Sequence, residues 1–285
     1  GEKVLDNAPV NAAWHTYFYP AKEGTPFRAQ YSFNVKSLPN GKLYAAIEMA
    51  SNLTSITFNG RSVTPPSYTG TLDDNCWKDI NFSRVELGEP VIGENLLVIE
   101  GQKINNVTAP NCHVAVEDFE NHKPTEVEAV YVIGDFSVET ADNTSFWIES
   151  PKSANPKDIT CSGYPFYAGQ AKLTAELTIE NKLPKYLLLE LVDAACARVF
   201  VNGQDCGVGY WAPFAYDISN AVKPGENVVE VIISTTLFNI LGPNRVVNIE
   251  SNTFISPKTF IDFELNFTPE YTLMPLGVKG FTLIA

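Results

Sequence analysis

The chain has 285 residues, of which 45% are hydrophobic and 12% aromatic, and its 20 basic and 33 acidic side chains give a formal net charge of −13. A charge of this sign repels phosphate backbones, which argues against nucleic acid as a partner. No stretch approaches the roughly 20 consecutive apolar residues of a membrane-spanning helix. The length suffices for two hydrophobic cores, so we expect an ordered protein without a membrane span.

In chain order, the first strong element is the segment from Phe27 to Val35, in which apolar and polar side chains alternate as in a half-buried strand. Residues 43–63 follow and contain the turn Asn59-Gly60, which favours the positive backbone angles of a two-residue hairpin. Residues 92–101 and 127–138 have the composition of further short strands.

Similar sequence segments then recur in the same order in the second half of the chain. Segment 171–179 matches 27–35, segment 186–208 matches 43–63, and segment 224–234 matches 92–101. The turn Asn202-Gly203 replaces Asn59-Gly60 at an offset of 143 residues (203 − 60). A period this long exceeds that of solenoid repeats and indicates two copies of a complete domain.

We therefore predict an all-β protein made of two tandem antiparallel jelly-roll β-sandwich domains, residues 1–140 and 141–285. The strand FWIES at 146–150 is expected to open the second domain, and no helix longer than two turns is expected. The chain has five cysteines, an odd number, and it is long enough to fold without disulfide bonds. We therefore expect no disulfide framework and a buried apolar role for most of the cysteines.

The first copy carries an insertion near residues 64–78 that the second copy lacks. Loops on a sandwich are where function is usually added. Tyr68 and Trp77 are candidates for recognition, and Asp73, Asp74 and Asn75 offer oxygen ligands for a small calcium site. The alternative is a surface loop without a function. We expect no other cofactor.

Signals for catalysis are weak. His15, His113 and His122 lie in no nucleophile-elbow or zinc-binding pattern. Glycoside hydrolysis needs two carboxyl groups held roughly 5 to 9.5 Å apart across a sugar. Nothing in the spacing of the acidic residues selects such a pair, so a free-standing glycosidase is the least favoured alternative.

The second copy carries the phrases GYPFYAG from Gly163, RVFVNGQDCGVGYWAPFAYDIS from Arg198 and KPGENVVEVIIS from Lys223. They resemble the sugar-binding β-sandwich of glycoside hydrolase family 2 enzymes, a galactose-binding-like domain. The first copy, with ITFNG, IGENLLVIEG and AVYVIGDFSVE, resembles the sandwich that precedes it in large bacterial proteins similar to family 106 α-L-rhamnosidases. The resemblance covers most of the chain, and its motifs are turns, core aromatics and strand ends.

In such enzymes the catalytic carboxylates lie on a separate (β/α)8 barrel, and no alternating helix-strand segment of that kind is present in this sequence. The resemblance implies accessory modules of a secreted bacterial glycoside hydrolase-like protein, extracellular or periplasmic, whose natural chain extends upstream of Gly1. Its partner would be carbohydrate or that upstream catalytic domain. A module that orients the barrel and never touches sugar is the alternative.

Aromatic rings stack on the C–H faces of sugars, and amide or charged groups bind the hydroxyls. Candidate carbohydrate-binding residues are Tyr164, Tyr167, Tyr210, Trp211, Asn239, Asn244 and Arg245 in the second copy, with Tyr68 and Trp77 in the insertion. Burial in the core is the alternative for the rings, and it is favoured for Phe166 and Trp211. A sugar platform would need at least two rings exposed in one concave site.

Overall fold

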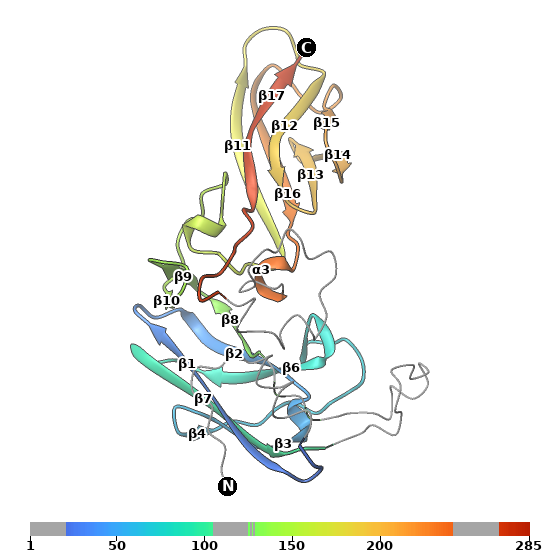
Figure 1. The fold of residues 1–285 in the computed structure, drawn as a ribbon. Coiled ribbons are helices and arrows are strands. Elements are labelled where there is room, and N and C mark those ends of the chain that lie inside the picture. Colours follow the sequence, from blue (N-terminus) through green and yellow to red (C-terminus); the bar gives the residue numbers. More distant parts are fainter. Residues whose placement is uncertain (1–20, 105–124, 126, 128, 242–267) are drawn as a thin grey trace. The chain divides into compact units, whose positions relative to one another are not determined.

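The computed structural model describes residues 21–104, 125, 127, 129–241 and 268–285 (Figure 1). Within these residues the chain forms short strands, and its one α-helix is a single turn, α3 (Phe238–Leu241). The all-β prediction is confirmed. No helix in the described ranges is long and apolar enough to cross a membrane.

The chain divides into two compact units. Among the described residues, unit 1 holds those up to Ser137 together with Ser145–Pro151 and Thr268, and unit 2 holds 138–144, 152–241 and 269–285. The chain first enters unit 2 within the strand β9 (Ser137–Thr140) and returns to unit 1 for Ser145–Pro151. Each unit is described separately below.

Unit 1 contains two β-sheets. One has the strand order β4-β3-β7-β1-β10 and the other β5-β6-β2-β8. The strands are β1 (Pro26–Val35), β2 (Asn40–Glu48), β3 (Leu53–Phe58), β4 (Arg61–Ser62), β5 (Cys76–Trp77), β6 (Asp79–Gly88), β7 (Gly93–Gln102), β8 (Tyr131–Asp135) and β10 (Phe146–Glu149), with the 3-10 turn η2 (Ala50–Asn52) after β2. Both sheets contribute to one core, as Leu43 and Ile47 of β2 pack with Phe58 of β3 and Leu97 of β7.

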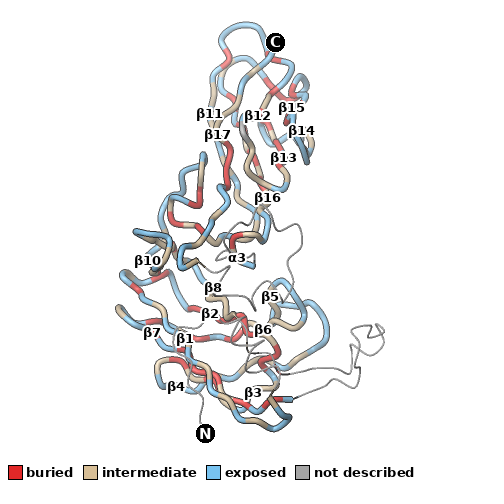
Figure 2. The backbone as a smooth tube through the Cα atoms, in the orientation of Figure 1, coloured by how far each residue is buried: buried red, intermediate tan, exposed pale blue. Residues whose placement is uncertain are grey.

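Unit 2 repeats this plan with two sheets of order β11-β16-β13-β14 and β15-β12-β17. The strands are β11 (Gln170–Ile179), β12 (Tyr186–Asp193), β13 (Cys196–Val201), β14 (Gln204–Gly209), β15 (Phe214–Asp217), β16 (Gly225–Ser234) and β17 (Gly277–Ile284), with the 3-10 turn η3 (Thr160–Ser162) before β11. Leu187, Val199 and Ile233 are fully buried between the sheets, and the buried segments in Figure 2 follow these strands.

The two units share one topology. The order β1-β7-β3-β4 in unit 1 corresponds to β11-β16-β13-β14 in unit 2, and β6-β2-β8 corresponds to β15-β12-β17. The turn residues correspond as well, since Asn59 and Asn202 have φ values of 50° and 51°. The repeated phrases of the sequence therefore mark equivalent places in two β-sandwiches, as predicted.

The strand FWIES does not open the second sandwich. It forms β10, which pairs in parallel with β1 of unit 1, with Asn34 opposite Trp147 and Val35 opposite Ile148. Alternation of side chains identifies a strand but not its partner, because pairing depends on residues distant in the sequence. The second copy shows no such added strand beside β11 in the described residues.

The prediction that most cysteines are buried is wrong for the four that the structure describes. Cys161 is exposed, Cys76, Cys196 and Cys206 are only partly buried, and all four are free thiols. They lie at strand ends, in a turn or at a bulge, and only Cys206 among these four packs against the core of unit 2. Cys206 is the extra residue of a bulge, because Val199 pairs with Gly207 and Phe200 with Asp205.

Candidate functional site

Tyr210 and Trp211 lie side by side in the loop between β14 and β15 of unit 2. Their relative exposures are 63% and 76%. The ring centroids are 6.1 Å apart and the planes are inclined by 38°. Two large rings exposed together are a candidate interaction surface. The interpretation of Trp211 as a core residue is wrong.

The space under this loop is filled by other aromatic side chains. Phe214 and Tyr216 occupy the inward positions of β15 and are buried. They close over Gly209, where an added Cβ would lie 2.7 Å from the Tyr216 hydroxyl and 2.8 Å from the Phe214 ring. Trp211, in contrast, is 76% exposed, so its side chain points away from these buried rings.

Tyr216 also fixes the base of the loop. Its hydroxyl donates a hydrogen bond of 2.8 Å to the carbonyl oxygen of Ala197 on β13. Burial raises the pKa of Tyr216 to about 12, so the hydroxyl stays protonated and keeps donating at neutral pH. The exposed rings thus project from an anchored stem.

An ion pair lies near this loop. Arg198 on β13 donates to the carboxylate of Asp205 on β14, with an Nε to Oδ1 distance of 3.3 Å and a second, shorter contact from Nη2. The hydrogen bond from Arg198 lowers the pKa of Asp205. Tyr210 is near enough to Arg198 to interact with it electrostatically, so this ion pair is a charged neighbour of the exposed rings.

Tyr167 and Asn239 meet in a separate, open depression of about 450 Å³. Tyr167 is 37% exposed, and its hydroxyl donates to the carbonyl oxygen of Gln170 at 2.6 Å. Asn239 is buried, and both ends of its amide bind the backbone of Met274, at 2.9 Å to the carbonyl and 2.8 Å from the N–H. The amide of Asn239 therefore fixes the backbone of Met274, which forms part of the wall of the depression.

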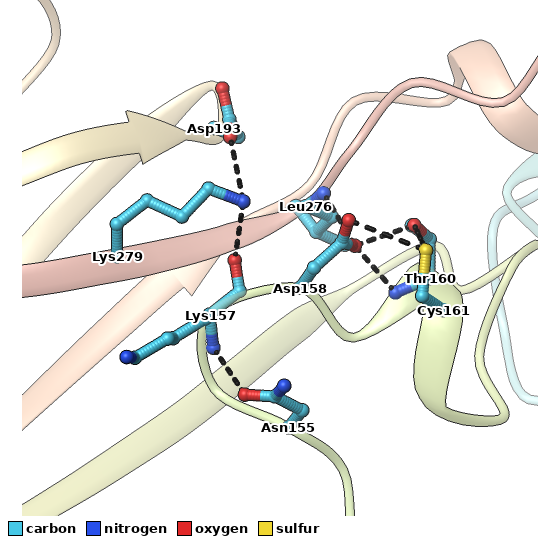
Figure 3. A network of polar contacts seen from close by, with 8 residues as sticks. All are labelled: Asn155, Lys157, Asp158, Thr160, Cys161, Asp193, Leu276 and Lys279. Carbon is cyan, nitrogen blue, oxygen red and sulfur yellow. Dashed lines mark hydrogen bonds and ion pairs between the residues drawn. The ribbon is translucent and has the colours of Figure 1, made fainter.

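Sequence reasoning missed the charged residue of this depression. Asp193, at the end of β12, lines it together with Thr235 and Thr236. Its carboxylate lies 3.7 Å from the ammonium of Lys279, which also donates to the carbonyl oxygen of Lys157 at 2.9 Å (Figure 3). The placement of Asp193 depends on pairing with Gly277 on β17, far away in the sequence, so no local signal marks it.

Asp158 lines a second depression of about 380 Å³, together with Thr160 and Cys161. Figure 3 shows the Asp158 carboxylate in contact with Thr160, Cys161 and Leu276. Burial alone would raise the pKa of Asp158, but hydrogen bonds from Thr160, Leu276 and Cys161 outweigh it and lower the pKa. A carboxylate that three hydrogen-bond donors keep ionised stabilises the local structure and is not suited to donate a proton.

Tyr164 is less available than expected. Its ring packs against the core of unit 2 and meets Tyr167 edge to face at 6.3 Å. Its hydroxyl donates to the carbonyl oxygen of Lys152 at 2.5 Å. Tyr164 thus supports Tyr167 from beneath.

The insertion of unit 1 places its aromatic residues against the β5-β6-β2-β8 sheet. Trp77 is half-buried and lies 5.0 Å from the ring of Tyr131 and 6.3 Å from that of Phe82. The Tyr68 hydroxyl donates to the side-chain oxygen of Asn81 at 3.4 Å.

Asp73 in the insertion stabilises the local turn by hydrogen bonds. The Asp73 carboxylate accepts hydrogen bonds from the Asn75 N–H at 2.8 Å and the Thr69 hydroxyl at 3.0 Å, and these lower its pKa. In the described ranges no group of three or more His, Cys, Asp or Glu side chains is placed to hold a metal ion. Asn244, Arg245 and the three histidines lie outside the described residues.

No family model matches the chain. Over 106 residues it is 34% identical to a protein of Formosa agariphila that is provisionally named a β-glucuronidase, and this match covers 36% of the chain and 8% of that protein. The chain therefore spans a small fraction of the length of this relative.

Among solved structures, the chain is similar to a rhamnosidase from Novosphingobium sp. PP1Y, with a TM-score of 0.31 and 17% identity, over 91% of this chain and 21% of that one. It is also similar to a β-D-glucuronidase from Dictyoglomus thermophilum, with a TM-score of 0.26 and 25% identity, over 42% and 22% of the two chains. TM-scores this low say nothing about activity.

Proposed function

We propose that this chain is a non-catalytic carbohydrate-binding part of a bacterial glycoside hydrolase-like protein that works in the periplasm or outside the cell. The observation that carries the proposal is the exposed pair Tyr210 and Trp211 on its anchored loop. Neighbouring aromatic rings match the apolar C–H face of a pyranose. The sequence match to a protein named as a β-glucuronidase supports the same class of ligand.

Three carboxyl groups of unit 2 support a non-catalytic role. A glycosidase needs a general acid whose pKa is raised, beside a second carboxylate. Here the pKa of Asp205 is lowered by Arg198 and that of Asp217 by hydrogen bonds from Ser219. Asp158 is held ionised by its neighbours in the same way.

Binding is expected to be weak. An open loop buries little of a monosaccharide, and its contacts must offset the ordering of both partners. We expect dissociation constants of about 1 mM, which is about −4 kcal/mol. Oligosaccharides that cover both rings should bind more tightly than monosaccharides.

The test is titration of the full chain with a panel of neutral and acidic oligosaccharides, followed by ligand-observed NMR. The double variant Tyr210→Ala with Trp211→Ala should lose binding at least tenfold. Tyr186→Ala is the matched control, because this ring is also exposed but lies on β12. Nitrophenyl glycosides of rhamnose, galactose and glucuronic acid should not be hydrolysed. Turnover that disappears on mutating one specific carboxylate would overturn the proposal.

The second candidate function is docking of a catalytic barrel without any contact with sugar. The same observation favours it, since exposed aromatic rings are also typical of protein interfaces. It predicts that the double variant leaves glycan binding unchanged, or that wild-type protein binds no glycan, while the variant weakens association with the remainder of the natural protein.

A further inference from the structure

One sheet face of unit 1 carries an arginine, Arg84, whose hydrogen-bonding groups are not all paired within the described residues. On β6 the side chains of Ser83, Val85 and Leu87 point into the core, so Phe82 and Arg84 share the outward face. In register, Ala46 of β2 pairs with Arg84 on one side and with Tyr131 of β8 on the other. The cation and the aromatic residues therefore lie on the same face of the β5-β6-β2-β8 sheet.

The Arg84 guanidinium lies over an aromatic ring. Its Cζ lies 4.0 Å from the centroid of Tyr44. Its Nε atom is buried and has no hydrogen-bond partner among the residues that the structure describes. A buried donor without an acceptor costs about 1–3 kcal/mol, so such a group in a native protein calls for an explanation, of which a missing ligand is one.

No carboxylate of the described residues forms an ion pair with Arg84, although this chain carries a net charge of −13. Glu86, the nearest acidic residue on the same strand, binds Lys42 at 2.6 Å instead. Glu48 lies on the same face of β2, opposite Phe82, and has its own interactions. A guanidinium presents a planar edge of donors that fits one carboxylate in a bidentate manner.

Aromatic rings continue this face beyond Arg84. Trp77, Phe82 and Tyr131 form a contiguous cluster with centroid distances of 5.0, 5.8 and 6.3 Å. The Lys78 ammonium lies 6.0 Å from the Trp77 centroid and adds a second positive charge. Residues two positions apart on a strand are separated by about 7 Å, so one or two sugar residues can span the distance from Phe82 to Arg84.

We infer that this face of unit 1 binds an acidic sugar. The carboxylate of a uronic acid residue would accept hydrogen bonds from the edge of Arg84, and an apolar face of the sugar would lie on the rings of Trp77 and Phe82. The inference rests on the proposed function and adds the charge of the ligand and a second binding surface, on the unit that does not carry Tyr210 and Trp211.

The test compares ligands that differ only at one position, using the full chain and ligand-observed NMR. Methyl β-D-glucuronide should bind at least ten times more tightly than methyl β-D-glucoside, and acetate should bind more weakly than either. This comparison needs no variant and so does not depend on whether a substituted protein folds.

Variants then locate the site. Arg84→Gln should remove the preference for the glucuronide, and Tyr44→Leu should reduce it because the guanidinium loses its support. Arg28→Gln is the matched control, since Arg28 lies on β1 in the other sheet of unit 1 and pairs with Glu100 at 3.3 Å. Thermal unfolding of each variant checks that it is folded.

Three results would overturn the inference. These are equal binding of glucuronide and glucoside, acetate binding as tightly as the glucuronide, and a glucuronide preference that survives Arg84→Gln. If sugar binding depends on Tyr210 and Trp211 but not on Arg84, the inference falls while the proposed function stands. If neither pyranoside binds wild-type protein, the inference falls, and the oligosaccharide panel decides the proposed function separately.

Discussion

Asn202 and Asn227 join two strands of unit 2 through a side-chain hydrogen bond, in which Nδ2 of Asn202 donates to Oδ1 of Asn227 at 2.9 Å. Asn227 is buried, and its Nδ2 in turn donates to the carbonyl oxygens of Lys223 and Gly225, each at 2.8 Å. Asn202 also accepts from the Val228 N–H at 3.0 Å. The hairpin turn is thereby tied to the start of β16.

Unit 1 contains the same arrangement. Nδ2 of Asn59 donates to Oδ1 of the fully buried Asn95 at 2.9 Å, and Oδ1 of Asn59 accepts from the Leu96 N–H at 2.8 Å. The asparagine of each Asn-Gly turn therefore has two functions. It adopts the left-handed conformation of the turn, and it clamps the turn to the neighbouring strand.

We predict that Asn227→Ala destabilises unit 2 by about 2–3 kcal/mol, because the substitution removes the hydrogen-bond partner of the Asn202 side chain and of backbone groups of Lys223 and Gly225. Asn95→Ala should have a similar effect on unit 1. Urea denaturation of the full chain, followed by circular dichroism, measures both. Asn181→Ala, at an exposed loop position, is the control and should change little. A change below about 0.5 kcal/mol for Asn227→Ala would show that the clamp does not contribute.

The exposure of Trp211 leads to a second prediction, on stability. Trp211→Ala should change the free energy of unfolding by no more than about 0.5 kcal/mol, as for most surface substitutions. Phe214→Ala, three residues later but in the core, should cost about 3–5 kcal/mol. Thermal unfolding of the two variants under identical conditions tests this contrast. A large loss for Trp211→Ala would mean that the ring is buried in solution.

The hydrogen bonds of Asp158 predict a dependence on pH. Because they lower its pKa below that of the unfolded chain, the ionised carboxylate stabilises the fold above about pH 4, and this contribution is lost as the pH falls through the lowered value. Asp158→Asn should therefore be less stable than wild type at pH 7 by about 1–2 kcal/mol. The difference should shrink below about pH 4.

Urea denaturation at several pH values checks this, with the exposed Glu180→Gln as control. A difference between Asp158→Asn and wild type that stays constant from pH 7 to about pH 3 would contradict the ionised state of Asp158.

The repeated phrases predicted the sheets well because their signals are local. An Asn-Gly turn requires positive φ at both positions, which Asn202 and Gly203 adopt at 51° and 80°. The alternation in segment 171–179 matches the observed exposure pattern of β11, which is also that of β1. Such features are determined by residues close together in the sequence, so they can be predicted without knowing the tertiary structure.

What the sequence did not reveal depends on distant residues. The 76% exposure of Trp211 runs against the usual burial of large aromatic rings, and it depends on how the loop between β14 and β15 packs on the rest of unit 2. The position of Asp193 depends on its pairing with β17. Arg84 stands out because its buried Nε has no acceptor within the described part of the chain, and an absent partner has no sequence pattern.

The approach of β17 to the loop before η3 gives the last prediction. At Gly277 an added Cβ would lie 2.6 Å from the carbonyl oxygen of Pro156 and 2.7 Å from the carbonyl carbon and oxygen of Lys157, all backbone atoms that cannot turn aside. Gly277→Ala should therefore destabilise unit 2 by about 1–3 kcal/mol or more.

Gly280→Ala is the matched control on the same strand, because its nearest neighbour is the flexible carboxylate of Glu190 at 3.4 Å. It should stay within about 0.5 kcal/mol of wild type in thermal or urea unfolding. Since the Lys157 carbonyl also accepts from Lys279, which faces Asp193, Gly277→Ala should disturb that network too. Equal stability of the two variants would show that the loop containing Pro156 and Lys157 can move to make room for a methyl group, and that Gly277 is not required for the packing of this loop.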